Sequence, residues 1–116
     1  MLWAVSAFAL TAAPISFTTP AVNASALSTD RHGEIPGAMW ARILKVLSLG
    51  VEHGQDGIVL GAWGCGAFGN DATAIAEQFR VALAGNFRGA YRRVTFAIVD
   101  WSPELRFIRP FQRAFP

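Results

Sequence analysis

The stretch that most constrains the fold of this chain is glycine-rich and covers residues 61–71, Gly-Ala-Trp-Gly-Cys-Gly-Ala-Phe-Gly-Asn-Asp. It follows the apolar run 58–60 and precedes a helix-like segment at 72–83, so the predicted order is strand, glycine loop, helix. Four glycines within residues 61–69 allow positive φ angles and a close approach of backbone N–H groups to a ligand. Because a helix start adds free N–H groups and a positive dipole end, we expect the loop to bind a phosphate.

The spacing of these glycines excludes the two commonest nucleotide-binding patterns. It is G-x-x-G-x-G-x-x-G, which differs from the dinucleotide pattern G-x-G-x-x-G, and no lysine follows as a P-loop requires. A tight turn in which Asn70 or Asp71 caps the helix is the plain structural alternative. A loop that grips some other nucleotide diphosphate stays open as well, because glycines alone do not distinguish the nucleotide.

Two helix-like segments and one further strand accompany the loop. Apolar residues recur at helical spacing after Pro36, a stripe that we expect to pack on the sheet, with His53 and Gly54 at its end. The members of this stripe are Trp40, Ile43, Leu44, Leu47 and Val51. The second stripe, which Gly85 and Asn86 end, consists of Ala72, Ile75, Ala76, Phe79 and Leu83. The unbroken apolar run 94–99, together with 58–62, predicts strands that are covered on both faces.

The chain end predicts a third, short helix. Ser102 is placed to cap it, with Pro103 at its first position, Leu105, Ile108 and Phe111 pointing inward, and Pro110 kinking or ending it.

The N-terminal residues 1–14 are apolar and admit two interpretations. The ending Ala12-Ala13 resembles a signal-peptide cleavage site, but no lysine or arginine precedes Arg31. We therefore prefer a buried strand at 3–10, followed by a long loop at 11–34 that leaves the ligand edge of the sheet and holds Asn23 and His32. Residues 1–14 are far shorter than the roughly 20 apolar residues of a membrane span, and we expect no membrane contact.

These elements predict one α/β domain over residues 1–116. The order is β-α-β-α-β-α, and connections of this length require parallel strands, right-handed crossovers and helices on both faces, which is a three-layer α/β/α arrangement. The 116 residues, 53% of them hydrophobic, are enough for one core.

Composition limits the chemistry of the chain. The one cysteine, Cys65, excludes an internal disulfide and favours a cytoplasmic location. Two isolated histidines, His32 and His53, make a structural metal site improbable, and we predict neither a metal nor a cofactor. Cys65 lacks a histidine at a spacing that indicates a nucleophile, so we expect it to be a small residue that fits a tight loop.

Positive charge is concentrated in the C-terminal part. Residues 77–116 hold seven arginines against three acids. Such a surface can attract a polyanion such as nucleic acid, although a solvated surface is the commoner meaning. Because no aromatic residues are interleaved on an exposed face, we predict no nucleic-acid binding.

Residues 60–71 resemble the diphosphate-binding loop of microbial-type poly(ADP-ribose) glycohydrolases, a branch of the macrodomain superfamily. The flanks agree: Thr-Thr-Pro-Ala-Val-Asn at 18–23 is similar to the family's Pro-Ala-Pro-Asn stretch, with Val22 in place of the second proline. Arg-Ile-Leu at 42–44 and the run 94–100 correspond to its preceding helix and its last core strand. The resemblance covers most of this chain but only the C-terminal half of the family's domain.

The resemblance implies a ligand and its contacts. ADP-ribose or poly(ADP-ribose) would bind through backbone N–H groups of the loop, with Phe68 on the ribose and Asn23 nearby. The implied contacts are Gly64, Cys65, Gly66, Ala67, Phe68, Gly69, Asn70 and Asn23. From the residues alone, Phe68 is equally well a core plug, and Trp63 is expected in the core. We expect Gly66 and Gly69 to need positive φ angles.

No catalytic residue is assigned. The family's catalytic segment, Gly-Gly-Gly followed by Gln-Glu-Glu, has no counterpart here, and the chain contains no Gly-Gly pair. Glycosidic cleavage requires a carboxylic acid at the leaving oxygen. Asp71 is expected to cap a helix, which leaves Asp100, after the last strand, as the best remaining acid. An inactive fragment that needs a missing N-terminal half is the alternative, and it would self-associate through an exposed sheet edge.

Overall fold

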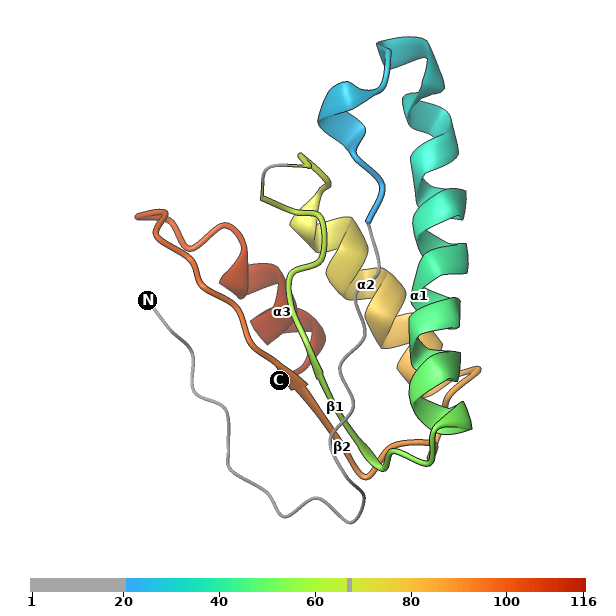
Figure 1. Cartoon of the computed structure of the whole chain (residues 1–116). Coiled ribbons are helices and arrows are strands. Elements are labelled where there is room, and N and C mark those ends of the chain that lie inside the picture. The colour runs from blue at the N-terminus through green and yellow to red at the C-terminus, as the bar shows by residue number, and fades with distance from the viewer. Residues whose placement is uncertain (1–20, 67) are drawn as a thin grey trace.

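The computed structural model describes residues 21–66 and 68–116 (Figure 1). They form two short 3-10 helices, three α-helices and a two-stranded sheet. In chain order these are η1 (Ala24–Ala26), η2 (Thr29–Glu34), α1 (Ile35–Glu52), β1 (Gly57–Leu60), α2 (Ala72–Ala84), β2 (Arg93–Phe96) and α3 (Ile108–Ala114). The strand expected at 3–10 and the alternative at 1–14 lie outside the described residues.

The sheet confirms the predicted α/β class. β1 and β2 are parallel, with Gly57 opposite Arg93 and Leu60 opposite Phe96, and α2 makes the connection between them. Both strands are shorter than the predicted ranges 58–62 and 94–99. One face of the sheet packs on the core through Ile58, Leu60 and Phe96. Val59, which alternates with them, stays 52% exposed, so this side of the described sheet carries apolar surface.

Helix α1 begins and ends where the sequence predicts. Pro36 lies in its first turn, His53 follows as the C-terminal cap, and Gly54 leaves the helix with a φ of 70°. The inward stripe is confirmed at Ile43 and Leu47 but wrong at Val51, which is 44% exposed. Val51 belongs to the last turn of α1.

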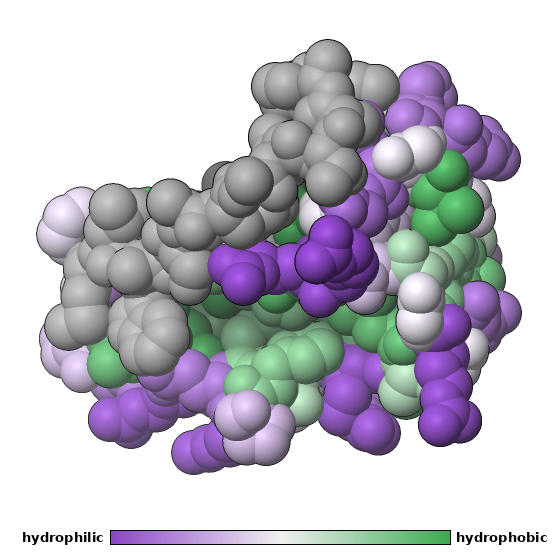
Figure 2. Space-filling view, turned by 90° about the horizontal axis from the view of Figure 1, so that it is seen from below, coloured by the Kyte–Doolittle hydropathy of each residue, from purple (hydrophilic) through white to green (hydrophobic). Residues whose placement is uncertain are grey.

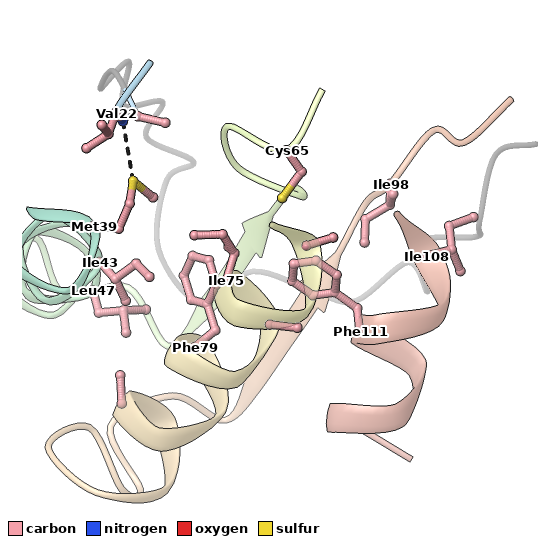
Figure 3. Packing of buried hydrophobic residues seen from close by; sticks show 14 residues of the cluster. Val22, Met39, Ile43, Leu47, Cys65, Ile75, Phe79, Ile98, Ile108 and Phe111 are labelled. Carbon is pink, nitrogen blue, oxygen red and sulfur yellow. Dashed lines mark hydrogen bonds between the residues drawn. The ribbon is translucent and has the colours of Figure 1, made fainter. Parts of the chain in front are cut away.

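Helix α2 lies between α1 and α3 and supplies the centre of the core (Figures 1 and 3). Asp71 caps it, as predicted, by accepting a hydrogen bond of 2.9 Å from the Thr73 N–H. Phe79 is fully buried, and its ring meets the Phe96 ring edge-on at a centroid distance of 5.4 Å. This contact joins the helix to β2. The labelled core side chains of Figure 3 come from α1, α2, α3, the loops that follow the strands and, at Val22, the segment before η1.

The third helix begins later than predicted. Ser102 does not cap it, residues 102–107 form turns, and Pro110 lies inside the first turn of α3 rather than ending it. The reason is Asp100, whose carboxylate accepts hydrogen bonds from the Phe107 and Ile108 N–H groups. These are the free donors of a helix start, so a residue well outside the helix fixes its beginning. Ile108 and Phe111 are buried as expected.

Seen from below the view of Figure 1, the surface shows a band of apolar side chains between hydrophilic ones (Figure 2). No helix among the described residues has both the length and the apolar character needed to cross a bilayer.

Candidate functional site

The glycine loop 61–71 leaves the carboxyl end of β1 and leads into α2. β2 continues beside it, since the Ala97 N–H donates a hydrogen bond to the Leu60 oxygen. Ligands of parallel α/β sheets bind at this end of the strands. The fold therefore places the loop at the end of the sheet where ligands of such folds bind.

Two glycines of the loop adopt the left-handed conformation. Gly64 has a φ of 76° and Gly69 a φ of 72°, which side chains disfavour. Neither has room for a Cβ atom: at Gly64 it would lie 2.7 Å from the Ala21 Cβ, and at Gly69 2.5 Å from the Ser25 Oγ. Gly66 differs from the expectation, because its φ is ordinary and the space around it is open.

Hydrogen bonds inside the loop divide its N–H groups into two sets. Cys65 donates to the Ala62 oxygen, Gly69 to Gly66, and Asn70 to Gly64, over 3.1, 3.0 and 2.9 Å. These three N–H groups hold the shape of the loop and are not free for a ligand. The N–H groups of Gly64, Gly66 and Phe68 have no acceptor among the described residues. Ala67 lies outside the described residues.

Asn70 acts through its side chain, which sequence reasoning missed. The amide is 93% buried and donates to the oxygens of Val22 and Gly64, over 2.6 and 2.9 Å. Its Oδ1 atom is buried and has no partner among the described residues. Asn70 therefore ties the loop to the segment 21–27, a contact across 48 positions that no local pattern reveals.

The segment 21–27 lies along the glycine loop. The Ser25 N–H donates to the Phe68 oxygen over 3.0 Å, and the Val22 N–H points to the Met39 sulfur at 3.3 Å (Figure 3). Asn23, a predicted ligand contact, uses its side chain to accept from the Ala26 N–H and so caps η1. Asn23 is exposed beside the loop, and its contact with a ligand stays a prediction. The sequence did not predict Ser25 as a neighbour of the glycine loop.

The two aromatic residues of the loop pack toward the core. Phe68 and Trp63 are half-buried and contact the hydrophobic cluster. The core position of Trp63 confirms the prediction. The packing of Phe68 against the cluster favours a role in the core. Part of its side chain stays exposed, so a ribose contact stays a prediction.

Cys65 is not a nucleophile in this structure. Its side chain is buried, and burial, followed by the negative charge of Asp71, raises the pKa of the thiol to about 12. The thiol is therefore protonated at neutral pH, and the reactive thiolate is absent. This agrees with the expectation of a small residue in a tight loop.

Asp100, the best remaining acid, is 99% buried and follows the end of β2 by four residues. Its carboxylate accepts from the Ser102 N–H and hydroxyl and from the N–H groups of Phe107 and Ile108. Burial alone would raise the pKa of Asp100, but these hydrogen bonds outweigh it and lower the pKa to about 2. A carboxylate that stays ionised at neutral pH cannot donate the proton that glycosidic cleavage requires.

The remaining charges lie on the surface. Arg80 pairs with Glu77 on α2, and Arg92 pairs with Asp56 at 3.7 Å. His32 lies in η2, and the Nδ1 atom of His53 lies 2.8 Å from the Leu49 oxygen. Within residues 21–66 and 68–116, no three histidine, cysteine or acidic side chains come together as metal ligands would.

Solved structures of bacterial poly(ADP-ribose) glycohydrolase are similar to this chain. The Deinococcus radiodurans enzyme in complex with ADP-ribose has a TM-score of 0.80 and 35% identity, over 83% of this chain and 40% of that chain. Its apo form has a TM-score of 0.79 at the same identity. The Thermomonospora curvata enzyme has a TM-score of 0.78 and 40% identity, over 84% of this chain and 36% of that chain.

These comparisons confirm the resemblance that the glycine loop indicated. The chain spans about 40% of the length of the solved chains that it matches. The sequence matches no protein-family model and no curated protein.

Proposed function

We propose that this chain is the ADP-ribose-binding or poly(ADP-ribose)-binding part of a microbial-type poly(ADP-ribose) glycohydrolase, with the diphosphate on the glycine loop. The observation that carries the proposal is the loop at the carboxyl end of β1, which keeps free N–H groups directly before a helix start. Its similarity to a solved glycohydrolase with bound ADP-ribose supports this ligand.

We propose fewer ligand contacts than the sequence predicted, because hydrogen bonds inside the loop already use three of its N–H groups. Gly64, Gly66 and Phe68 are the proposed N–H donors, with Ala67 included by resemblance. Cys65, Gly69 and Asn70 hold the loop in shape and position these donors. Asn23, beside the loop, is a proposed contact of the adjoining ribose.

We propose that the chain alone binds but does not cleave. The loop stabilises a bound diphosphate equally before and during bond cleavage, whereas rate enhancement needs a proton donor at the scissile oxygen. Asp100 is buried and ionised, and Asp71 is occupied as a helix cap. Poly(ADP-ribose), rather than nucleic acid, is the proposed polymer, and the cytoplasm is the proposed location.

The alternative is that the chain works only together with a further part of such a domain. Val59 and Val99 are 52% and 51% exposed, which favours a covering layer on this apolar surface. Without a cover, the same surface would support self-association.

Isothermal titration calorimetry with ADP-ribose tests the binding proposal. Gly66→Val should abolish binding while the thermal midpoint stays within about 2 °C, because the φ is ordinary and the space is open. Gly69→Val should lose both binding and stability, because it combines a positive φ with a clash at Ser25.

Gly33→Val is the matched control, since Gly33 has equally open surroundings in η2, away from the loop. It should bind as the unmodified chain does. Unchanged ADP-ribose affinity in Gly66→Val would remove the loop from the binding site.

A further inference from the structure

Ser25 contacts the glycine loop twice, from a segment that is far away in the sequence. Its backbone N–H donates to the Phe68 oxygen over 3.0 Å, and its Oγ atom lies 2.5 Å from the place that a Cβ atom at Gly69 would occupy. Ser25 belongs to η1, which lies beside the loop (Figure 1). The two contacts reach neighbouring residues of the loop through different atoms of Ser25.

The first contact fixes the peptide unit that joins Phe68 to Gly69. The oxygen of this unit accepts from the Ser25 N–H, and its own N–H, on Gly69, donates to the Gly66 oxygen over 3.0 Å. A planar unit with a hydrogen bond at each end cannot rotate without breaking one of them. The Phe68 N–H, a proposed ligand donor, is joined to this fixed unit through the Phe68 Cα atom. The direction of that donor therefore depends on the hydrogen bond from Ser25.

The second contact keeps residue 69 without a side chain. Gly69 has a φ of 72°, which already favours glycine, and the Ser25 Oγ atom excludes a Cβ atom on steric grounds as well. The next nearest atoms to that Cβ position are the Ser25 N and Cβ atoms, at 3.7 and 3.8 Å, which are ordinary van der Waals distances. The hydroxyl oxygen is therefore the atom that closes this space.

Ser25 is held in place by the rest of its segment. The Val22 N–H donates to the Met39 sulfur of α1 over 3.3 Å, and the Val22 oxygen accepts from the Asn70 side chain over 2.6 Å. Leu27, at the end of the segment, packs against the hydrophobic core. An anchored segment can hold a loop in one conformation before a ligand arrives, which lowers the entropy that binding costs.

We propose that Ser25 is a positioning residue of the glycine-loop site. Its N–H group orients the Phe68 donor, and its hydroxyl group excludes a side chain at residue 69. The proposal rests on the proposed function and adds to it a residue outside the glycine-rich sequence. In this role Ser25 acts on the ligand only through the loop.

Calorimetric titration with ADP-ribose tests the role of the N–H group. Ser25→Pro removes this donor and should weaken ADP-ribose binding roughly threefold to tenfold, as loss of one hydrogen bond does. Ser25→Ala keeps the N–H group and should bind as the unmodified chain does. Thr29→Pro is the matched control, because Thr29 begins η2 and follows Ser28, whose backbone is extended as a residue before proline requires. It should leave the affinity unchanged.

Amide hydrogen exchange in the unmodified chain gives a second measurement, which decides the matter should Ser25→Pro not fold. Saturation with ADP-ribose should slow exchange at the Ser25 N–H, because a hydrogen bond that favours binding is favoured by the bound ligand in equal measure. The Leu27 N–H, which donates to the Ala24 oxygen in the same segment, should slow less. Equal slowing at both groups would make Ser25 a part of the fold alone and overturn the positioning role.

A double-variant cycle tests the steric contact without any ligand. Gly69→Ala combines an unfavourable φ with the clash at the Ser25 Oγ atom, whereas in the Ser25→Ala background only the φ penalty remains. The fall in thermal midpoint that Gly69→Ala causes should therefore be smaller in that background. Equal falls in the two backgrounds would overturn the steric part of the proposal.

The affinities separate this proposal from the proposed function. Unchanged ADP-ribose affinity in Ser25→Pro, with binding intact in the unmodified chain, would overturn the positioning role alone. Equal losses of affinity in Ser25→Pro and Ser25→Ala would make the hydroxyl a direct ligand contact and also overturn it. Failure of the unmodified chain to bind ADP-ribose would contradict the proposed function itself.

Discussion

At the scale of single residues, Asp100 shows how one buried carboxylate can organise a chain end. It was the best acid on sequence grounds because it follows the last strand. Its environment gives it a different task, since its oxygens accept hydrogen bonds from Ser102 and from the first N–H groups of α3. The same hydrogen bonds that make it useful to the fold remove it as a proton donor.

The low pKa of Asp100 predicts an acid-sensitive fold. A carboxyl whose pKa is lower in the folded chain than in the unfolded chain stabilises the fold above the unfolded value, which is 3.8 here. This stabilisation is lost as the pH falls from about 4 toward the folded pKa of about 2. We therefore expect the free energy of unfolding to decrease across this window, as measured by urea denaturation at successive pH values.

Asp100→Asn should lower stability at neutral pH and abolish that part of the acid dependence, because an amide NH₂ cannot accept from the surrounding donors. Glu104→Gln changes an exposed acid of the same loop and is the control, with little effect expected. An acid dependence that is the same in Asp100→Asn and in the unmodified chain would contradict the assigned role.

At the scale of elements, local patterns predicted what local interactions decide. The start of α1 at Pro36, its end at His53 and the cap of α2 at Asp71 are set by a few neighbouring residues, and these predictions are confirmed. The predicted start of α3 was wrong. The Ser-Pro pair resembles a helix start, but Asp100 binds N–H groups seven and eight positions away and so fixes a later start. The loop itself was predictable from its glycines. Which of its N–H groups donate inside the loop, and which have no acceptor there, was not predictable.

The tie between Asn70 and segment 21–27 explains why the site was only partly predictable. Its hydrogen bond to Val22 joins residues 48 positions apart, and such contacts appear only once the chain is folded. In the sequence, Asn70 resembles a turn residue or a backbone donor. The structure shows it as the support of the loop.

Asn70→Ala should therefore lower the free energy of unfolding by about 1–3 kcal/mol, because the Val22 oxygen loses its side-chain donor and the Gly64 oxygen keeps only the backbone N–H of residue 70. It should also weaken ADP-ribose binding, since the donors of the loop lose their fixed positions. Asn23→Ala removes one exposed cap of η1 and should cost less stability. Equal stabilities of Asn70→Ala and the unmodified chain, by urea denaturation, would show that the tie is dispensable.

At the scale of the whole molecule, the sheet side carries apolar surface that the described helices do not cover. The helices bury one face of the sheet through Phe79 and Phe96, whereas Val59 and Val99 stay half-exposed. A strand pair with one apolar face in water tends to find a partner. The solved chains that this chain matches are longer, and it spans about 40% of their length.

We expect the unmodified chain to self-associate at high concentration, as measured by light scattering. Val59→Lys should reduce the association, because a lysine at the contact would have to bury its charge. Val81→Lys places the same charge on exposed α2 and should leave association unchanged. An unmodified chain that stays monomeric at high concentration would contradict this expectation.

Amide NMR spectroscopy during titration with ADP-ribose tests the central claim most directly, because it reports on each N–H group of the loop separately. The account predicts the largest shifts at Gly64, Gly66 and Phe68, whose N–H groups have no acceptor within the described chain. Smaller shifts are expected at Cys65, Gly69 and Asn70, which already donate inside the loop. Absence of shifts at all six residues, or saturable shifts confined to another part of the chain, would contradict the claim that this loop holds the diphosphate.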